Sequence, residues 1–589
     1  MTKFYSFLSN GITSALELNG SIEWLTFPRF DSPAVFCKIL DKEKGGSFEV
    51  KPLDEVLLIQ RNYMGNSLVL KTVFITRVGK LELIDFLPIG LTALIRIYNS
   101  DIPFRVIINP VFNYGLINSS IEEVENGIIY RNPLSKEALE LLIKGRYSRE
   151  NHYGLIFQPG RGYLYLLYSR DIKYGLFSAK GIVYSKPEEA LNRAISYWES
   201  RVNKARKVRE FKDIYERSLL VLLGLIYSPS GGLIASPTTS LPEVIGSQRN
   251  WDYRYVWVRD ASYSAEALIK AGLVVYARNI LSFLLSVIDP SSKSFDHPLY
   301  AVDGSPPPAE ESLNWLSGFM NSYPVRIGNA AYLQIQMDIE GAFMNALSEY
   351  YFMTEDKEYL DDNWFAIESI ADWVKSSWRE KSTDIWEERD TLEHFVHTKV
   401  MSWVALDRAS KIAYSLGYKR EGDEWKGMAE EIRNDVMMNG YSEELNSFVR
   451  FYGCKEVDSS LLMLPIYGFI EATDWKFVKT LEKIERELIV SDRFFLRYKN
   501  DFLGKAIYPF TLISTWMARV KIRMGEIEGA KKVINSLVNC STDLLLLGEH
   551  LDPHSCEPRG NFPHAFPHSG LVLSIIELED MQNGYLNRR

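Results

Sequence analysis

The stretch PEEALNRAISYWESRVNKAR, Pro187 to Arg206, separates two kinds of sequence in this chain. The stretch is polar with a helical pattern, and its proline stands where the first turn of a helix has an N–H group to spare. We therefore predict a helical linker over residues 186–211. It would join a β-rich domain over residues 1–185 to a helical domain over residues 212–589.

The segments before this stretch have the composition of strands. They are rich in β-branched and aromatic residues and are separated by Gly, Asn and Pro. The clearest are SLVLKTVFIT (67–76), KLELIDFLPIG (80–90), FRVIINPVFNYG (104–115), GYLYLLYS (162–169) and YGLFSAKGIVYS (174–185). An antiparallel sandwich is the simplest packing for them.

After the linker the pattern predicts about a dozen helical segments. They begin near Lys212, Asp260, Leu273, Asn329, Lys357, His394, Arg420, Ser459, Asp474, Ala506, Glu526 and Phe566. The connectors after even-numbered segments are short, such as AG, TED and GE, and those after odd-numbered segments are long. If successive helices run antiparallel, every long loop emerges at one end. This predicts a closed ring of about six helical hairpins whose long loops surround one mouth.

The overall composition excludes several classes of function. The 589 residues are 46% hydrophobic and 24% charged, which is typical of a globular protein. A net charge of −9 without a basic block argues against a nucleic-acid partner. The N-terminus lacks the pattern of a signal peptide, and no apolar run is long enough for a bilayer. We therefore expect a cytoplasmic protein without a membrane segment, and scarce Gln beside plentiful Lys, Glu and Ile favours a hot habitat.

The cysteines and histidines give no metal-binding pattern. Four scattered residues, Cys37, Cys454, Cys540 and Cys556, are predicted to be reduced structural thiols. His564 and His568 have the spacing of zinc ligands on a helix, but Pro563 and Pro567 should interrupt a regular helix there. We expect neither a metal nor a cofactor.

The first long loop contains QRNWDYRYVWVRD, Gln248 to Asp260. Its rings at alternate positions would share one face of an extended backbone: Trp251, Tyr253, Tyr255 and Trp257. One interpretation is a half-buried strand. The other is a sugar site, where rings stack on the C–H faces of a hexose and Arg259 and Asp260 hold its hydroxyls. Asp260 could instead cap the helix that follows.

Two other long loops supply carboxylates. STDIWEERD (382–390) places Glu387 and Glu388 directly after Trp386, and GEHLDPHSCEPRGNFPHAFPHSG (548–570) contains Glu549. Clustered carboxylates usually form a solvated face. Two carboxylates that face each other across a mouth lined with rings are instead what glycosidic bond cleavage needs, because one protonates the leaving oxygen and the other activates the nucleophile.

RNWDYRYVWVRD, IWEERD and GEHLDP…GNFPHAFPHSG, in this order after a β-rich half, resemble glycoside hydrolase family 15, the family of glucoamylases, glucodextranases and prokaryotic-type trehalases. Further fragments fit it too: GSIEWLTFPRFDSPAVF, ASPTTSLPE from Ala235, YPVRIGNAAYLQIQMD from Tyr323 and HTKVMSWVALDRA from His397. The resemblance covers nearly the whole chain. It implies an N-terminal super-β-sandwich, a helical linker and a C-terminal (α/α)6 barrel.

The resemblance also implies a role for each site residue. Glu387 would be the general acid, Glu549 the general base, and Tyr253 would help to hold the attacking water. The other implied substrate-binding residues are Arg259 and Asp260 on the terminal glucose, Glu388 and Arg497 on the leaving sugar, and the rings of Trp257 and Trp386. His550 follows Glu549 where many prokaryotic relatives have an acidic residue, a departure that could retune the base.

The implied reaction is inverting and exo-acting. We expect a glucoamylase that releases β-glucose from non-reducing ends of maltooligosaccharides or soluble glucans, since no starch-binding segment follows Arg589. The alternative is a trehalase, because trehalose also presents a terminal α-glucose. A sugar phosphorylase would replace the base with phosphate-binding donors, and a non-catalytic glucan-binding protein would not need both carboxylates. Whether the chain forms a homo-oligomer stays open.

Overall fold

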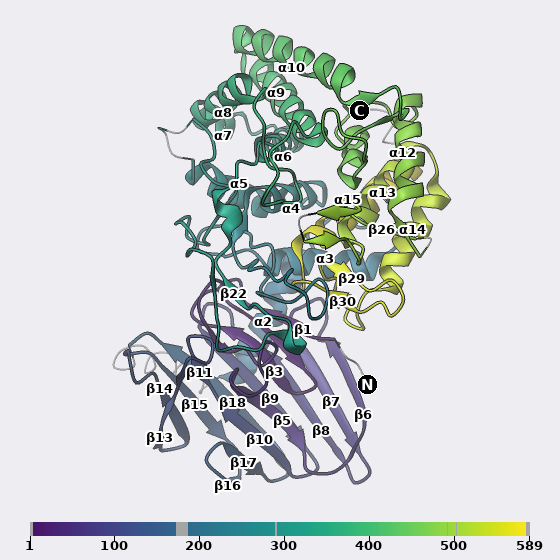
Figure 1. The fold of residues 1–589 in the computed structure, drawn as a ribbon. Helices are drawn as coiled ribbons and strands as arrows, with labels where there is room; N and C mark the ends of the chain where they lie inside the picture. The colour runs from purple at the N-terminus through teal and green to yellow at the C-terminus, as the bar shows by residue number, and fades with distance from the viewer. Residues whose placement is uncertain are drawn as a thin grey trace.

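The computed structural model describes residues 4–171, 186–288, 291, 293–491, 493–501 and 503–584. The N-terminal part consists of strands and lies below a larger helical part in the view of Figure 1. The two parts are joined by helix α2 (Pro187–Val202), which begins at the proline that the sequence places in the first turn.

The strands form two antiparallel eight-stranded sheets. The first follows the order β1 (Ser6–Ser9), β2 (Ser14–Leu18), β3 (Ser21–Thr26), β5 (Ser47–Pro52), β10 (Phe104–Asn109), β17 (Gly154–Phe157) and β16 (Tyr147–Arg149), with β4 (Ala34–Phe36) beside β3. The second follows the order β13 (Ser120–Val124), β14 (Gly127–Arg131), β15 (Ala138–Lys144), β18 (Gly160–Ser169), β9 (Ala93–Ser100), β8 (Lys80–Phe86), β7 (Leu70–Thr76) and β6 (Val56–Tyr63).

The two sheets share one buried core. Phe48 and Val50 of the first sheet belong to the same apolar cluster as Leu70 and Phe74 of the second. Along β7 buried and half-buried residues alternate, as they do when one face of a strand packs inward. Four of the five predicted strand segments are confirmed as β7, β8, β10 and β18, and the fifth, residues 174–185, lies outside the described residues.

Helix α2 covers the outer face of the second sheet. Ala194 is buried there, and Leu191 and Ile195 pack on the same cluster, which includes Val69 and Tyr165 of the sheet region. The helix has an apolar stripe at i, i+3 and i+4 with charged residues on its other side, as an amphipathic helix should. The predicted linker is therefore a packed element of the structure.

The helical domain contains every predicted helical segment. Its helices are α3 (Lys212–Gly224), α4 (Val258–Lys270), α5 (Val274–Ser286), α6 (Ile339–Thr354), α7 (Lys357–Asp362), α8 (Trp364–Ser377), α9 (Val396–Leu416), α10 (Lys419–Asn439), α11 (Met463–Ile466), α12 (Trp475–Leu488), α13 (Thr511–Arg523), α14 (Ile527–Asn539) and α15 (Ala565–Gln582). The largest shift in position is at α6, which starts ten residues after the predicted Asn329, because residues 330–333 form a separate 3₁₀ turn.

Alternate helices form a closed inner ring. Contacts run from α4 to α6, on through α9, α11, α13 and α15, and back to α4. The inner helices are buried almost all round, as in α4, where residues 258–269 are all buried. Outer helices bury one stripe, as in α12, where Phe477, Leu481, Ile484 and Leu488 face inward. This is the (α/α)6 arrangement that the alternating loop lengths predict.

The long loops of the ring also contact the sandwich. Arg254 of the first loop is fully buried; its Nη1 donates to the carbonyl of Ser32 at 2.9 Å and its Nη2 pairs with Asp252 at 2.7 Å. In the second loop, the indole of Trp315 donates to the carbonyl of Tyr114. The sandwich therefore fixes the base of two loops.

Among the described helices, none combines the length and the hydrophobicity that crossing a membrane requires.

Candidate active site

The long loops of the ring enclose a pocket of about 480 Å³. Its walls come from the first, third, fifth and sixth long loops and from the N-terminal parts of α4, α13 and α15. Eight of the nine predicted site residues line it: Tyr253, Trp257, Arg259, Asp260, Trp386, Glu387, Arg497 and Glu549. Glu388 does not line it. Segments more than 290 residues apart in sequence thus meet in one cavity.

Glu387 reaches the pocket from the third long loop. Its backbone has a φ of +62°, a left-handed conformation that few residues other than glycine adopt. The amide of Gln334 donates to the carbonyls of Glu387 and Glu388 at 3.0 and 3.3 Å and supports this turn. Oε1 of Glu387 accepts three hydrogen bonds, from Trp257 Nε1 at 2.8 Å, Arg259 Nη2 at 3.0 Å and Gln336 Nε2 at 3.1 Å.

Hydrogen bonds to Asp384 turn the side chains of the neighbouring Glu387 and Glu388 in different directions. Oδ1 of Asp384 accepts hydrogen bonds from the backbone N–H groups of Trp386 and Glu388, and its Oδ2 pairs with Arg450 at 2.5 Å. Glu388 is buried and lies 2.8 Å from the same guanidinium of Arg450. Glu387 therefore points into the pocket while Glu388 points into a buried ionic cluster. This position does not support the expected contact between Glu388 and a leaving sugar.

Glu549 enters the pocket from the sixth long loop. Its backbone carbonyl accepts from the N–H of Thr511 at 2.9 Å, and its Oε1 accepts from the hydroxyl of Tyr253 at 2.9 Å. Gly560, at a φ of +73°, leaves room for this carboxylate, because a Cβ atom there would lie 2.3 Å from Oε2 of Glu549. Burial and the charge of Glu549 raise the pKa of Tyr253 well above its ordinary value, so the phenol remains a donor.

Arg259 and Asp260 lie side by side in the first turn of α4. The helix begins at Val258 and its N-cap is Trp257, so the alternative in which Asp260 caps the helix is wrong. Arg259 is held by Asp338 and by Gln336, each 2.9 Å from Nη1. Asp260 is buried in the pocket wall, and burial, with the nearby charge of Glu387, raises its pKa well above the ordinary value. Such a group in a cavity is typical of a functional site.

Arg497 lies on the fifth long loop and contacts an acidic residue that has no assigned role. Its Nη2 donates to both carboxylate oxygens of Glu243, at 2.9 and 2.8 Å. His550 lies beside this pair, with Nε2 3.5 Å from Oε1 of Glu243 and 3.7 Å from Oε1 of Glu549. Donor atoms of Glu243, Glu549 and His550 lie within 4.8 Å of one another, a set able to hold a metal ion. Arg497 already compensates the charge of Glu243, which disfavours a divalent metal ion there.

A second cavity of about 430 Å³ shares Tyr253, Trp386, Glu387 and Arg497 with the first. Trp251 lines it, with the guanidinium of Arg389 4.0 Å from its ring centre. Arg249 of the first loop pairs with Asp501 of the fifth loop at 2.5 Å across this wall. The site therefore consists of two adjacent cavities with aromatic and charged walls, each suited to a hydroxylated ring.

The aromatic run of the first loop is only in part a strand. Val256 and Trp257 form the two-residue strand β19, and the preceding residues belong to a loop. Trp251, Tyr253 and Trp257 face the cavities, while the hydroxyl of Tyr255 is 3.1 Å from Asp252. Three of the four alternating rings therefore line the cavities, and the fourth, Tyr255, lies in the core.

His564 and His568 lie at the start of α15. The expectation that the prolines interrupt a helix here holds for Pro563, which precedes α15, but fails for Pro567, because the helix begins at Ala565 and holds Pro567 in its first turn, where proline is tolerated. His564 Nδ1 accepts from the N–H of Phe566, and His568 Nε2 accepts from the N–H of Leu547. Burial lowers the pKa of His564 to about 4 and that of His568 to about 3, so both rings are neutral.

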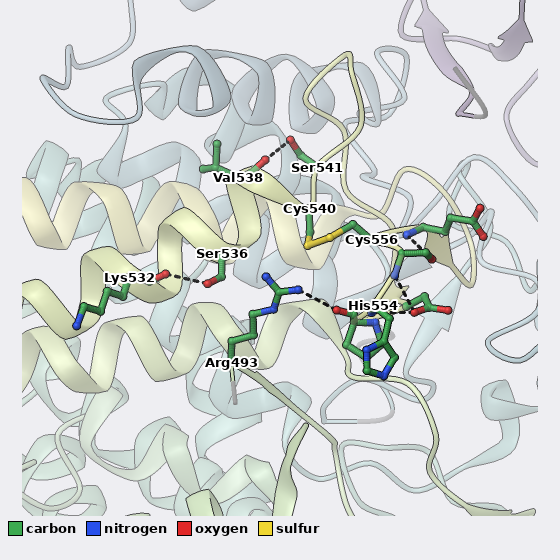
Figure 2. Close-up of a disulfide and its surroundings, with 12 residues drawn as sticks. Arg493, Lys532, Ser536, Val538, Cys540, Ser541, His554 and Cys556 are labelled. Atoms are coloured by element: carbon green, nitrogen blue, oxygen red, sulfur yellow. Dashed lines mark hydrogen bonds between the residues drawn. A yellow bond between two sulfur atoms is a disulfide. The ribbon is translucent and has the colours of Figure 1, made fainter. Parts of the chain in front are cut away.

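The loop that carries Glu549 is closed by a disulfide. Figure 2 shows the bond between Cys540, at the end of α14, and Cys556, which are 16 residues apart. Arg493 also donates to the carbonyl of Pro553 in this loop. The prediction of four reduced thiols is wrong for this pair, and Cys37 and Cys454 are free. The error arose because this spacing matches no metal-binding or redox motif.

Three contact residues of the site had no predicted role: Gln334, Gln336 and Glu243. Two are isolated amides in a long loop and the third follows a proline, so local sequence gives no sign of their function. Their one sequence signal is that they fall inside the fragments ASPTTSLPE and YPVRIGNAAYLQIQMD, which carry the family resemblance.

Both parts of the chain match models of known protein families. Residues 209–576 match the family model described as glycosyl hydrolases family 15, and residues 3–136 match the model described as trehalase-like, N-terminal. A bacterial glucoamylase solved in complex with acarbose superposes with a TM-score of 0.76, over 100% of this chain and 96% of that one. Because the two sequences are 15% identical, this likeness shows the fold alone.

Two relatives are similar over nearly their full lengths. Trehalase 2 of Sulfolobus acidocaldarius is 58% identical over 578 residues, which cover 98% of this chain and 100% of the relative. A trehalase of Thermoplasma acidophilum is 32% identical over 96% of this chain and 98% of the relative.

Proposed function

The chain belongs to glycosyl hydrolase family 15, and from this premise we propose that it is a trehalase, which cleaves α,α-trehalose into two glucose molecules with inversion at the reacting carbon. The observation that supports trehalose as the substrate is the 58% identity to Trehalase 2 of Sulfolobus acidocaldarius, which covers 98% of this chain and 100% of the relative. Trehalase, the alternative from the sequence analysis, therefore replaces the expected glucoamylase as the proposed activity. The enzyme class, a glycoside hydrolase that acts on an α-glucoside, is unchanged.

The two cavities suit a disaccharide. One glucose would occupy the first cavity beside Arg259 and Asp260, and the leaving glucose would occupy the second cavity beside Trp251. The ion pair between Arg249 and Asp501 connects the first and fifth loops at the second cavity, which favours a short substrate over a long glucan. In this arrangement the scissile oxygen would lie beside Glu387, which lines both cavities.

Glu387 is assigned as the general acid. Its Oε1 is anchored by Trp257, Arg259 and Gln336, and no hydrogen bond within the described part of the chain uses its Oε2. Oε2 is therefore able to carry the proton that passes to the leaving oxygen. Protonating that oxygen avoids the release of an alkoxide, a contribution of about 10²–10⁴-fold in rate.

Glu549 is assigned as the general base. Tyr253 occupies its Oε1, and the absence of a side chain at Gly560 keeps space beside its Oε2. A water bound to Oε2 of Glu549, beside the hydroxyl of Tyr253, would lose its proton to the carboxylate as it attacks the anomeric carbon. Since this carboxylate is present and already oriented, water is favoured over phosphate as the nucleophile, and catalysis over simple glucan binding.

The substrate is tested by comparing initial rates of glucose release from trehalose and from maltotriose by the purified protein. We expect kcat/KM for trehalose to exceed that for maltotriose by at least about 100-fold, because a maltotriose chain must extend beyond the second cavity. A higher kcat/KM for maltotriose would restore the glucoamylase interpretation, and cleavage that requires added phosphate would replace hydrolysis by phosphorolysis.

A further inference from the structure

His550 is the residue at which this chain departs from the acidic residue expected after the base, and the hydrolytic mechanism above leaves it unused. Its side chain is 1% exposed and belongs to strand β29 (His550–Leu551), between the base and the ring of Phe510, whose centre is 5.0 Å away. A buried imidazole must satisfy both ring nitrogens or pay a desolvation penalty. The oxygens around those nitrogens therefore determine its protonation state.

Both ring nitrogens face acceptors. Nδ1 lies 3.4 Å from the carbonyl oxygen of Tyr508. Nε2 lies 3.5 Å from Oε1 of Glu243 and 3.7 Å from Oε1 of Glu549, and it has no closer hydrogen-bond partner among the described residues. Either neutral tautomer would direct one nitrogen lone pair at an oxygen. An imidazolium, with a hydrogen on both nitrogens, satisfies the carbonyl and the carboxylates together.

We infer that His550 is held as a buried imidazolium between Glu243 and Glu549, and that it acts as a positioning residue which keeps the base Glu549 ionised in acidic solution. This inference rests on the proposed role of Glu549 as base. It assigns His550 no contact with the substrate, because the residue does not line either cavity.

The surrounding charges support this assignment. Arg497 neutralises Glu243 through both oxygens, so the positive charge of His550 compensates Glu549. Arg249 pairs with Asp501, and burial lowers the pKa of His564 to about 4, so this neighbouring ring stays neutral. Tyr253 also stays neutral and donates to Glu549. Arg497 also attracts Glu549, but its two hydrogen bonds to carboxylate oxygens both go to Glu243.

The pKa shifts of the pair agree with the geometry. Burial alone would lower the pKa of His550, but the two carboxylates outweigh burial and raise it. Burial would raise the pKa of Glu549, but the nearby imidazolium of His550 outweighs burial and lowers it. Each group thus favours the charged form of the other. A metal ion in the same place would have to compete with Arg497 for Glu243 and with Tyr253 for Glu549.

The pH dependence of kcat/KM tests the role. Removal of the cation raises the pKa of Glu549, so in His550→Gln the acidic limb should move to higher pH by about 1–3 units, the usual effect of one nearby opposite charge. His554→Gln, an exposed histidine of the same loop, is the matched control and should leave the limb in place. If His550→Gln lowers the maximum of kcat/KM without moving the acidic limb of the pH profile, the residue is merely structural and the inference fails.

The charge of His550 is measured independently by ¹⁵N NMR of the wild-type protein with labelled histidine. At pH 8 a histidine with the ordinary pKa of about 6.5 is neutral, and burial lowers the pKa of His397, His564 and His568. In a titration from pH 5 to pH 8, one ring among the eight histidines is expected to stay doubly protonated to a higher pH than the other seven. Its absence would overturn the inference whatever the substrate is, whereas its presence without trehalose hydrolysis would overturn only the proposed function.

Discussion

Asp384 determines which of two neighbouring carboxylates reaches the substrate. Because it accepts hydrogen bonds from the N–H groups of Trp386 and Glu388, the chain turns so that Glu387 faces the cavity and Glu388 faces Arg450. The sequence WEE places two acids together but carries no information about this turn. The residue-level predictions therefore separate the roles of these two glutamates.

Glu387→Gln should lower kcat for trehalose by about 10²–10⁴-fold, because the amide keeps the shape of the side chain but has no proton to donate. The loss should be much smaller for α-glucosyl fluoride, whose leaving group needs little protonation. Steady-state kinetics on both substrates measures the difference. Glu388→Gln is the matched control: it leaves Arg450 short of a buried partner, so its effect should appear in thermal unfolding and be equal for both substrates. Equal losses in Glu387→Gln would place the acid elsewhere.

Asp260→Asn should lower the activity without lowering the thermal stability. Burial raises the pKa of Asp260, so at neutral pH its charged form destabilises the folded state, and an amide relieves that cost. We expect an unchanged or higher unfolding temperature at pH 7, together with a loss of about 10²-fold or more in kcat/KM, since the amide presents a hydrogen-bond donor where a sugar hydroxyl needs an acceptor. Kinetics and calorimetry on one preparation check both. Wild-type activity would remove Asp260 from the substrate site.

At the scale of elements, the sixth long loop combines the base, its neighbour His550 and a disulfide. The bond between Cys540 and Cys556 closes a loop around Glu549 and limits the conformations of the unfolded chain. Sequence could place this loop at the mouth, because its length exceeds that of the helix hairpin turns. It could not reveal the disulfide, since pairing depends on how the loop folds back onto the end of α14.

Cys540→Ser should lower the free energy of unfolding by about 3 kcal/mol, the value expected for a closed loop of about 15 residues. Denaturant unfolding of the oxidised protein, with and without the substitution, measures this difference. Cys454→Ser is the matched control, because Cys454 is a half-buried free thiol. A similar unfolding midpoint for Cys540→Ser and the control would show that the bond contributes nothing to stability.

At the scale of the whole molecule, much of the fold could be predicted from the sequence. Alternating loop lengths are a direct consequence of helical hairpins in a ring, so the six long loops and their common mouth follow without any structure. The positions of strands β7, β8, β10 and β18 follow from their composition. What sequence could not supply is the contact between domains, such as that of Arg254 with Ser32, because it joins residues more than 200 positions apart.

The same limit applies to the candidate site. Motifs identified eight residues that line one cavity, because each motif is local in sequence. The residues that orient them, Gln336 on Glu387 and Glu243 beside His550, come from other loops and have no motif of their own. The second cavity is formed from the first, second, third and fifth long loops, which is why one sequence could not choose between trehalose and maltooligosaccharides.

Glu387 and Glu549, from opposite loops, are assigned to a single inverting displacement on trehalose. Proton NMR of the two glucose anomers within the first minutes of the reaction, before mutarotation mixes them, distinguishes this displacement from a double one. Inversion converts one glucose to the β anomer while the leaving glucose stays α, so we expect an initial β to α ratio of about one. Initial release of α-glucose alone would show double displacement, and would contradict the assignment of Glu549 as the base.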